Sequence, residues 1–204
     1  RELAVRAQIP MPRVFLIDDP QPNAFATGRD PAHGVVAITS GILEILSARE
    51  LRGVLAHELA HIRNRDILIS TIAACVTGVI TYAAHAIGFF GMGSHGNEDG
   101  EHASPFTGIL MALVAPLAAT IIQLGISRSR EYLADETGAE ISGDPLALAS
   151  ALARLEEAAS VVPSAAAQPA TASLFIVNPF AGGKRLARLF STHPATADRI
   201  ARLE

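Results

Sequence analysis

Ala48–Asp66 reads ARELRGVLAHELAHIRNRD, and the HELAH segment at its centre decides how the rest of the chain is interpreted. In an α-helix, side chains four residues apart lie on one face, so His57 and His61 can bind a single metal ion. Glu58 points about 100° further round the helix, towards a water molecule on the open side of the metal. The pattern is typical of a zinc hydrolase with two histidine ligands and a glutamate general base.

The alternative interpretation is a buried helix that carries two incidental histidines. Apolar side chains recur at helical spacing along this segment, at Leu51, Val54, Leu55, Leu59 and Ile62. Such a helix is buried beside its histidine face, which would keep a bound metal ion dry and fixed. The motif alone does not separate the two interpretations, and the following segments favour the metal site.

Two long uncharged runs follow the HELAH segment. Neither Ile67–Gly93 nor Phe106–Ile126 contains a Lys, Arg, Asp or Glu residue. One bilayer crossing needs about 20 apolar residues, and Pro116 in the second run is better tolerated in a membrane helix than in a soluble one. We therefore predict a two-helix transmembrane hairpin. The alternative is a helical hairpin buried in a soluble core.

The charges around the two runs predict their orientation. The linker Ser94–Pro105 has no Lys or Arg and is acidic, whereas both outer flanks are basic. By the positive-inside rule the outer flanks face the cytoplasm and the linker lies across the membrane. The charged residues concerned are Glu98, Asp99 and Glu101 in the linker, Arg63 and Arg65 before the first run, and Arg128 and Arg130 after the second.

The hairpin also locates a third metal ligand. His61 lies shortly before the first run and Glu131 shortly after the second, so both stand roughly 8–9 Å from the same membrane face. Asp135 follows Glu131 by four residues and shares its helix face. We predict that Glu131 completes a His57–His61–Glu131 metal site and that Asp135 hydrogen-bonds a ligand histidine. The alternative is an exposed helix with ordinary ion pairs to Arg128 and Arg130.

With these motifs the chain resembles the HtpX membrane metallopeptidases, relatives of the CAAX prenyl proteases. The resemblance covers nearly all of the chain. It is carried by four blocks in the family's order: PNAFATG at Pro22–Gly28, GVLAHELAHIRNRD at Gly53–Asp66, SRSREYLADETGA at Ser127–Ala139, and LFSTHP at Leu189–Pro194. Family members begin with two further membrane helices, whereas this chain opens at Arg1 without a methionine. We expect it to be a fragment lacking those helices.

The resemblance implies a zinc-dependent, ATP-independent endopeptidase of the bacterial inner membrane, which cuts the cytosolic parts of misfolded membrane proteins. It implies one Zn²⁺ on His57, His61 and Glu131, with Glu58 as general base. It also implies that His193 helps to stabilise the oxyanion. The fold expected is α+β and mainly helical: one zincin-type metallopeptidase domain over residues 1–204, with a small β-sheet and the embedded hairpin.

Bulk properties agree with one membrane-bound catalytic domain. Half of the 204 residues are hydrophobic and few are aromatic, which suits Ala- and Leu-rich helices. The net charge is −4 and there is no basic cluster, so we expect no nucleic-acid partner. The single cysteine, Cys75, has no partner for a disulfide within the chain, as expected for a catalytic part that faces the cytoplasm.

Short β-rich segments precede the HELAH helix. Val14–Ile17 and Val35–Thr39 read as strands, and Asn23–Thr27 reads as a third. Thr39 or Ser40 should cap a helix that starts near Gly41. A small sheet beside the HELAH helix would offer an edge to an extended substrate, and we place substrate contacts at Asn23, Ala24 and Phe25. The alternative is a purely structural sheet.

The C-terminal part reads as mostly helical. Asp144 should cap a helix over Pro145–Ala159, because proline is favoured at the first helical position. Val162–Ser173 is rich in Ala, Pro and Ser and predicts a loop, and Leu174–Val177 is short and β-like. His193 precedes a last helix that contains Arg199, which we expect to make an ion pair near the site. From its position alone, His193 would be a cap or surface residue.

Three classes of function are considered for this sequence. The first is a zinc endopeptidase that acts on protein or peptide substrates at a lipid bilayer. The second is a catalytically inactive membrane adaptor of the same fold, whose mark would be a broken ligand set. The third is a channel-like hairpin, which is disfavoured because the ionisable residues cluster outside the two runs.

Overall fold

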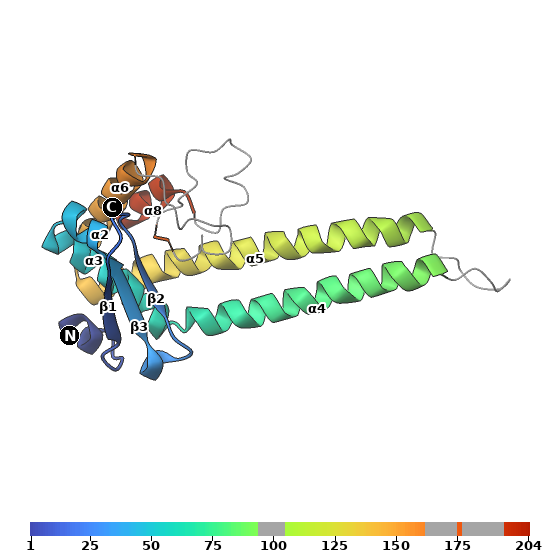
Figure 1. Cartoon of the computed structure of the whole chain (residues 1–204), viewed down its shortest axis with the longest axis horizontal. Coiled ribbons are helices and arrows are strands. Elements are labelled where there is room, and N and C mark those ends of the chain that lie inside the picture. The colour runs from blue at the N-terminus through green and yellow to red at the C-terminus, as the bar shows by residue number, and fades with distance from the viewer. Residues whose placement is uncertain (94–104, 162–174, 177–193) are drawn as a thin grey trace. The chain divides into compact units, whose positions relative to one another are not determined.

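The computed structural model describes residues 1–93, 105–161, 175–176 and 194–204 (Figure 1). The elements in order are α1 (Glu2–Arg6), β1 (Arg13–Ile17), β2 (Ala24–Thr27), a 3₁₀ turn η1 (Pro31–His33), β3 (Val35–Thr39), α2 (Ser40–Ile45), α3 (Ala48–Arg63), α4 (Asp66–Gly93), α5 (Pro105–Ser142), α6 (Pro145–Val161) and α8 (Thr196–Leu203). The chain forms two compact units. The first unit contains residues 1–68 and 127–204, and the second contains residues 69–126. The fold class is the mainly helical α+β class expected from the sequence.

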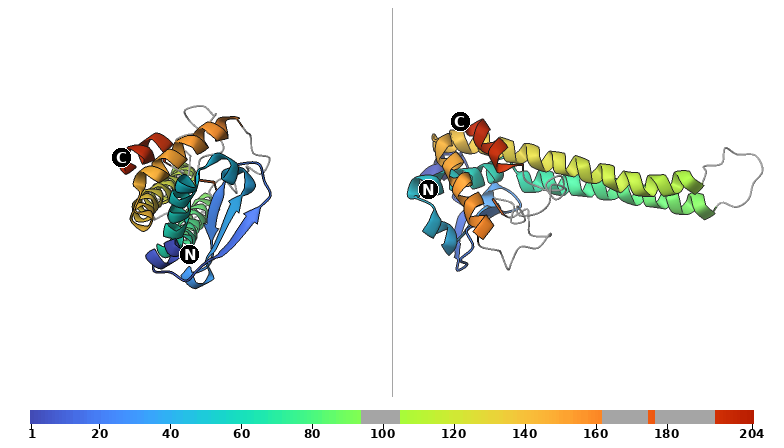
Figure 2. Two further views of the ribbon diagram at one scale, coloured as in Figure 1. Left: turned by 90° about the vertical axis from the view of Figure 1, so that its left-hand side faces the viewer. Right: turned by 90° about the horizontal axis from the view of Figure 1, so that it is seen from above.

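The small sheet has the strand order β1-β3-β2, with β1 parallel and β2 antiparallel to β3 (Figure 2). All three predicted strands are present, and only their ends differ from the prediction by a residue. Thr39 ends β3 and caps α2, since its hydroxyl accepts a hydrogen bond from the Ile42 main-chain N–H. The strand next to α3 is β2, an edge strand.

The start of α3 is fixed by a capping box. The Ser47 hydroxyl accepts a hydrogen bond from the Glu50 N–H, and a Glu50 carboxylate oxygen accepts one from the Ser47 N–H at 2.9 Å. Two donors that would otherwise be unsatisfied at the helix start are thereby satisfied. This start sets the rotation of the HELAH segment on α3.

The end of α3 differs from the sequence prediction. Ala48–Asp66 is not one continuous helix, because α3 ends at Arg63 and α4 begins at Asp66. Between them Arg65 adopts φ 56°, a left-handed conformation that cannot continue an α-helix. The chain therefore turns sharply just before the first uncharged run.

Two apolar clusters flank α3 and bury it. One joins it to α2, α6 and α8 through residues such as Val54, Leu148 and Leu152. The other joins it to α1, β3 and the C-terminal part of α5 through Leu59, Val36 and Ile141, among others. A helix buried on both sides holds its side chains in fixed positions, as the sequence predicted for the HELAH face.

Helix α5 approaches α3 closely at Gly138. A Cβ atom on Gly138 would lie 2.9 Å from the His57 Cα, closer than a side chain can come. Glycine here therefore allows the C-terminal part of α5 to contact the turn of α3 that carries His57. This contact fixes the distance between α3 and α5 at His57.

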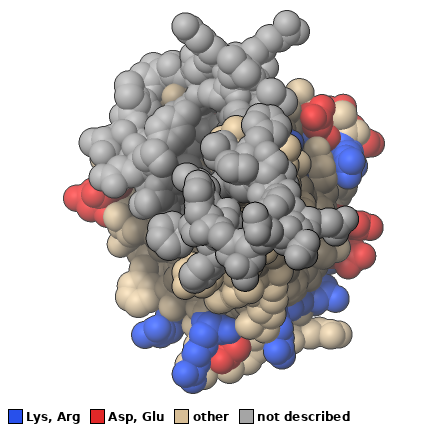
Figure 3. Space-filling view, turned by 90° about the vertical axis from the view of Figure 1, so that its right-hand side faces the viewer, with Lys and Arg blue, Asp and Glu red and all other residues tan. Residues whose placement is uncertain are grey.

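In the second unit, α4 and α5 run side by side in both views (Figures 1 and 2). Among the described residues, Asp66–Ile87 is the one helical segment long and apolar enough to span a membrane, and only 6% of it is buried. The described surface facing the viewer in Figure 3 is mostly uncharged, with charged side chains at its margin. Exposed apolar side chains such as Ile72 and Val79 are unlike a soluble core.

Some of the remaining predicted features lie within the described residues and others lie outside them. The second predicted span lies in α5, where the structure describes no side chains for residues 105–109, 111 and 112. That span therefore stays a prediction. Asp144 does cap α6, since its carboxylate accepts a hydrogen bond from the Ala147 N–H at 3.2 Å. The predicted loop at 162–173 lies outside the described residues. Of the β-like segment 174–177 only residues 175 and 176 are described, and they form no strand.

Candidate metal centre

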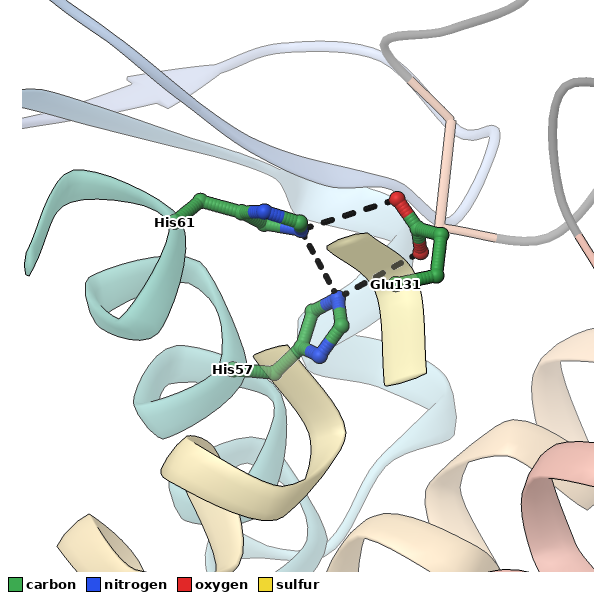
Figure 4. A group of neighbouring side chains, drawn as sticks. All are labelled: His57, His61 and Glu131. Atoms are coloured by element: carbon green, nitrogen blue, oxygen red, sulfur yellow. Dashed lines mark hydrogen bonds and ion pairs between the residues drawn. The ribbon is translucent and has the colours of Figure 1, made fainter. Parts of the chain in front are cut away.

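His57, His61 and Glu131 meet in the first unit, with both histidines on α3 and the carboxylate on α5 (Figure 4). The two Nε2 atoms are 3.1 Å apart. The Glu131 oxygens face them, with Oε2 at 3.8 Å from His57 Nε2 and Oε1 at 3.7 Å from His61 Nε2. The structure therefore brings together the three residues that the sequence selected as ligands.

The donor set fits a metal ion in type and spacing. Bond lengths of about 2.0–2.2 Å in a tetrahedral zinc site separate neighbouring ligand atoms by about 3.3–3.6 Å. The three observed separations, 3.1, 3.7 and 3.8 Å, lie on both sides of that range. Two imidazole lone pairs that face each other at 3.1 Å repel unless a proton or a cation lies between them. A cation shared with Glu131 satisfies all three groups at once.

Each histidine has a carboxylate at its other ring nitrogen. His57 Nδ1 lies 3.0 Å from Asp135 Oδ1, and His61 Nδ1 lies 2.6 Å from Asp66 Oδ2. A carboxylate at Nδ1 favours the tautomer with the proton on that atom, which leaves the Nε2 lone pair to bind the metal. Both rings are thus oriented with Nε2 towards Glu131.

Arg199 closes the buried side of the centre. Its side chain is 2% exposed and binds Asp135 through two hydrogen bonds, of 2.8 Å from Nε and 2.6 Å from Nη2. Its Nη1 donates to the Ile176 carbonyl at 3.1 Å and lies 3.4 Å from Glu131 Oε2. The paired guanidinium keeps the pKa of Asp135 below its usual value although burial opposes this shift.

Glu58 lies on α3 beside the ligands and is buried. Burial raises the pKa of Glu58 to about 7, with a contribution from Glu131, while the His61 charge and a hydrogen bond from the Ala26 main chain act in the opposite direction. A carboxylate with a pKa near neutrality can both accept and return a proton. This is the protonation behaviour that a general base and acid needs.

The two histidines differ in basicity. Burial lowers the pKa of His57. Burial also acts to lower the pKa of His61, but the hydrogen bond to Asp66 and the charges of Glu131 and Glu58 raise it to about 9. Metal binding must release the proton from His61, so metal affinity should fall as the pH decreases.

The three residues proposed to contact substrate lie at the start of β2. Asn23 and Ala24 are buried, and the Asn23 main chain bonds Thr39 through a carbonyl that accepts and an N–H that donates. Phe25 is partly exposed. The side chains of Asn23 and Ala24 are therefore not exposed to a substrate, and the Asn23 main chain is already bonded to Thr39. Substrate contact at these residues stays a prediction.

The structure also adds residues that the sequence interpretation missed. Asp66 was assigned only to the end of the HELAH segment, but it bonds His61. Gly138 was not selected, although an isolated glycine in a helical pattern signals a close approach. His193 lies outside the described residues, so its role remains a prediction.

Comparison with known proteins assigns the chain to a family. The model of peptidase family M48 matches residues 1–204. The chain belongs to peptidase family M48. It is therefore a metalloprotease, a hydrolase of peptide bonds that depends on a metal ion.

Several named relatives support this assignment. Proteins named "Protease HtpX homolog" from Burkholderia thailandensis, Burkholderia mallei and Burkholderia pseudomallei are each 58% identical over 205 residues. These matches cover 100% of this chain and 70% of each relative. The resemblance to the HtpX family that the motifs indicated is thus confirmed.

A solved structure shares the fold. The crystal structure of S. mikatae Ste24p matches with a TM-score of 0.59 and 20% identity, covering 94% of this chain. The chain spans only 44% of that protein's length. At this identity the likeness supports the fold alone.

The contact between Asp135 and His57 yields a test. Asp135→Ala removes the carboxylate that orients His57, and we expect zinc affinity to fall roughly 10–100-fold. Competition with a chromogenic chelator measures the zinc dissociation constant. Glu136→Ala is the matched control, because Glu136 is the next residue of α5 and is exposed. A dissociation constant equal to that of the wild type would reduce Asp135 to an ion-pair partner of Arg199.

Proposed function

We propose that this chain is the catalytic part of a zinc-dependent endopeptidase of the bacterial inner membrane. It cleaves misfolded membrane proteins on the cytoplasmic side. The observation that carries the proposal is the convergence of His57, His61 and Glu131, with Glu58 beside them on α3. Two imidazoles and one carboxylate suit zinc, whereas magnesium and calcium sites are built from oxygen ligands.

In this proposal the chain's own residues divide the work. His57, His61 and Glu131 would hold the zinc ion, which would supply Lewis-acid chemistry to the scissile carbonyl and to the attacking water. Glu58 takes the proton from the attacking water and returns it to the leaving amine, so that a peptide bond and an O–H bond break while a C–O and an N–H bond form. Asp135 and Asp66 orient the ligand histidines. His193 helps to stabilise the oxyanion of the tetrahedral intermediate, as the family resemblance implies.

The edge of the sheet supports an extended mode of substrate binding. The Ala26 main-chain N–H bonds the Glu58 carboxylate. The outer edge of β2 therefore borders the proposed general base. A substrate strand laid along this edge would pair through its main chain and place a peptide bond beside Glu58 with little dependence on side chains. Such pairing suits a protease that acts on many misfolded proteins.

The membrane location rests on α4 and on charge. An exposed apolar helix of this length matches the thickness of a bilayer core. The four arginines that flank the two uncharged runs all belong to the first unit, which also holds the metal centre. The positive-inside rule then favours a cytoplasmic active site.

The alternative of an inactive adaptor has no specific support. An adaptor that had lost catalysis would tolerate a missing ligand or a replaced general base. Here the three ligands and Glu58 are all present. An inactive adaptor is therefore the weaker explanation.

A substitution at Glu58 tests the mechanism. Glu58→Gln keeps the size of the side chain and leaves all three ligands, but it removes the base. We expect full zinc occupancy and a loss of peptidase activity of about 10²–10⁴-fold. Activity is measured on an unfolded protein substrate in detergent, with the exposed Glu136→Gln as control. Wild-type activity in the fully metallated Glu58→Gln protein would refute the assigned role.

Cysteine labelling tests the proposed topology. In a Cys75→Ala background, a cysteine at Gly96 should react with an impermeant thiol reagent added from outside the inner membrane. A cysteine at Ser129 should not react, because the arginine-rich flanks hold that side in the cytoplasm. Labelling at Ser129 alone would invert the topology. A protein that stays in solution without detergent would argue against the membrane hairpin altogether.

A further inference from the structure

Asp66 stands at a junction between the metal centre and the apolar helix. It is the first residue of α4, it is 5% exposed, and it belongs to the same compact unit as the metal centre. Its carboxylate lies 2.6 Å from His61 Nδ1. Its main-chain carbonyl accepts a hydrogen bond of 3.2 Å from Arg130, the residue before Glu131. One residue thus contacts a ligand with its side chain and the neighbour of another ligand with its main chain.

The turn before Asp66 explains how it reaches His61. Asn64 is the C-cap of α3 and Arg65 takes a positive φ of 56°, so the helix is interrupted before Asp66. The Asn64 amide donates to the Thr137 hydroxyl on α5 at 3.4 Å. Together with the bond from Arg130 to the Asp66 carbonyl, this contact attaches both ends of the turn to α5. The Asp66 carboxylate is therefore held in place and does not simply cap a helix.

His61 depends on such support more than His57 does. The His57 side chain is 2% exposed and Gly138 of α5 packs against its main chain, so the surroundings of His57 already restrict rotation of the ring. The His61 side chain is 20% exposed. A ring with space on one side needs a hydrogen bond to hold its orientation, and Asp66 supplies it at Nδ1.

We propose that Asp66 is a positioning residue for His61 that ties the geometry of the metal centre to the first turn of the apolar helix α4. The inference rests on the proposed function, because it takes His61 as a zinc ligand. The two ligand histidines are then oriented by separate carboxylates. Asp135 is held by Arg199 within the core of the first unit, whereas Asp66 is carried by the helix that continues as the apolar run.

The test uses the whole chain in detergent, with the variants Asp66→Asn and Asp66→Ala. Asparagine keeps the size and an oxygen that can accept the hydrogen bond from Nδ1, whereas alanine removes the contact. We expect the zinc dissociation constant to rise roughly 10–100-fold in Asp66→Ala and by a smaller factor in Asp66→Asn. The visible absorption of the cobalt-substituted protein should change in both variants, because that spectrum reports the orientation of the ligands.

Two controls separate positioning from helix support. The unfolding temperature of the metal-free protein reports any loss from the start of α4, and we expect Asp66→Asn to leave it unchanged. Asp144→Asn is the matched control, because the Asp144 carboxylate caps α6 and pairs with Arg49 and contacts neither ligand histidine. Its zinc dissociation constant and cobalt spectrum should match those of the wild type. If both Asp66 variants share the zinc affinity and cobalt spectrum of the wild type, Asp66 has no positioning role. A wild-type protein that binds no zinc would overturn the proposed function, and the inference with it.

Discussion

The close packing of α5 on α3 is the constraint on which the metal centre depends. Glu131, Asp135 and Gly138 are spaced four and three residues apart, so they lie on one face of α5. Each has a different task on that face: Gly138 lets the helices approach at His57, Asp135 bonds the His57 ring, and Glu131 joins the two histidines. A side chain at position 138 would push the helix away and would move the carboxylates with it.

Two of the buried carboxylates of the centre lie against basic side chains, Asp135 against Arg199 and Asp66 against His61. Glu58, Glu131, Asp135 and Asp66 bring four carboxyl groups into the interior, where an unpaired charge is very costly. Arg199 balances Asp135 and approaches Glu131. The high pKa of Glu58 and the basic His61 show where a further positive charge is needed. A divalent cation between the three side chains would supply that charge and would link the stability of the site to metal binding.

Much of this arrangement could be predicted from local sequence patterns. Spacing on a helix selected His57 and His61, the two uncharged runs located Glu131, and Asp135 follows Glu131 by four residues. The caps at Thr39 and Asp144 follow from local side-chain chemistry. The contacts of Asp66 and Arg199 could not be predicted in detail. Asp66 reaches His61 only because Arg65 turns the chain at a positive φ, and Arg199 meets Asp135 across 64 residues of sequence. For the substrate contacts, alternation in a short strand does not reveal that Asn23 and Ala24 face the core.

The central claim is that His57, His61 and Glu131 together hold one zinc ion, and zinc content tests it most directly. The measurement is the zinc-to-protein ratio by mass spectrometry after exhaustive dialysis, for the wild type, Glu131→Ala and the exposed control Glu136→Ala. We predict one zinc ion per chain in the wild type and in the control, and a large loss in Glu131→Ala. Full zinc occupancy in Glu131→Ala, or no zinc in the wild type, would contradict the account.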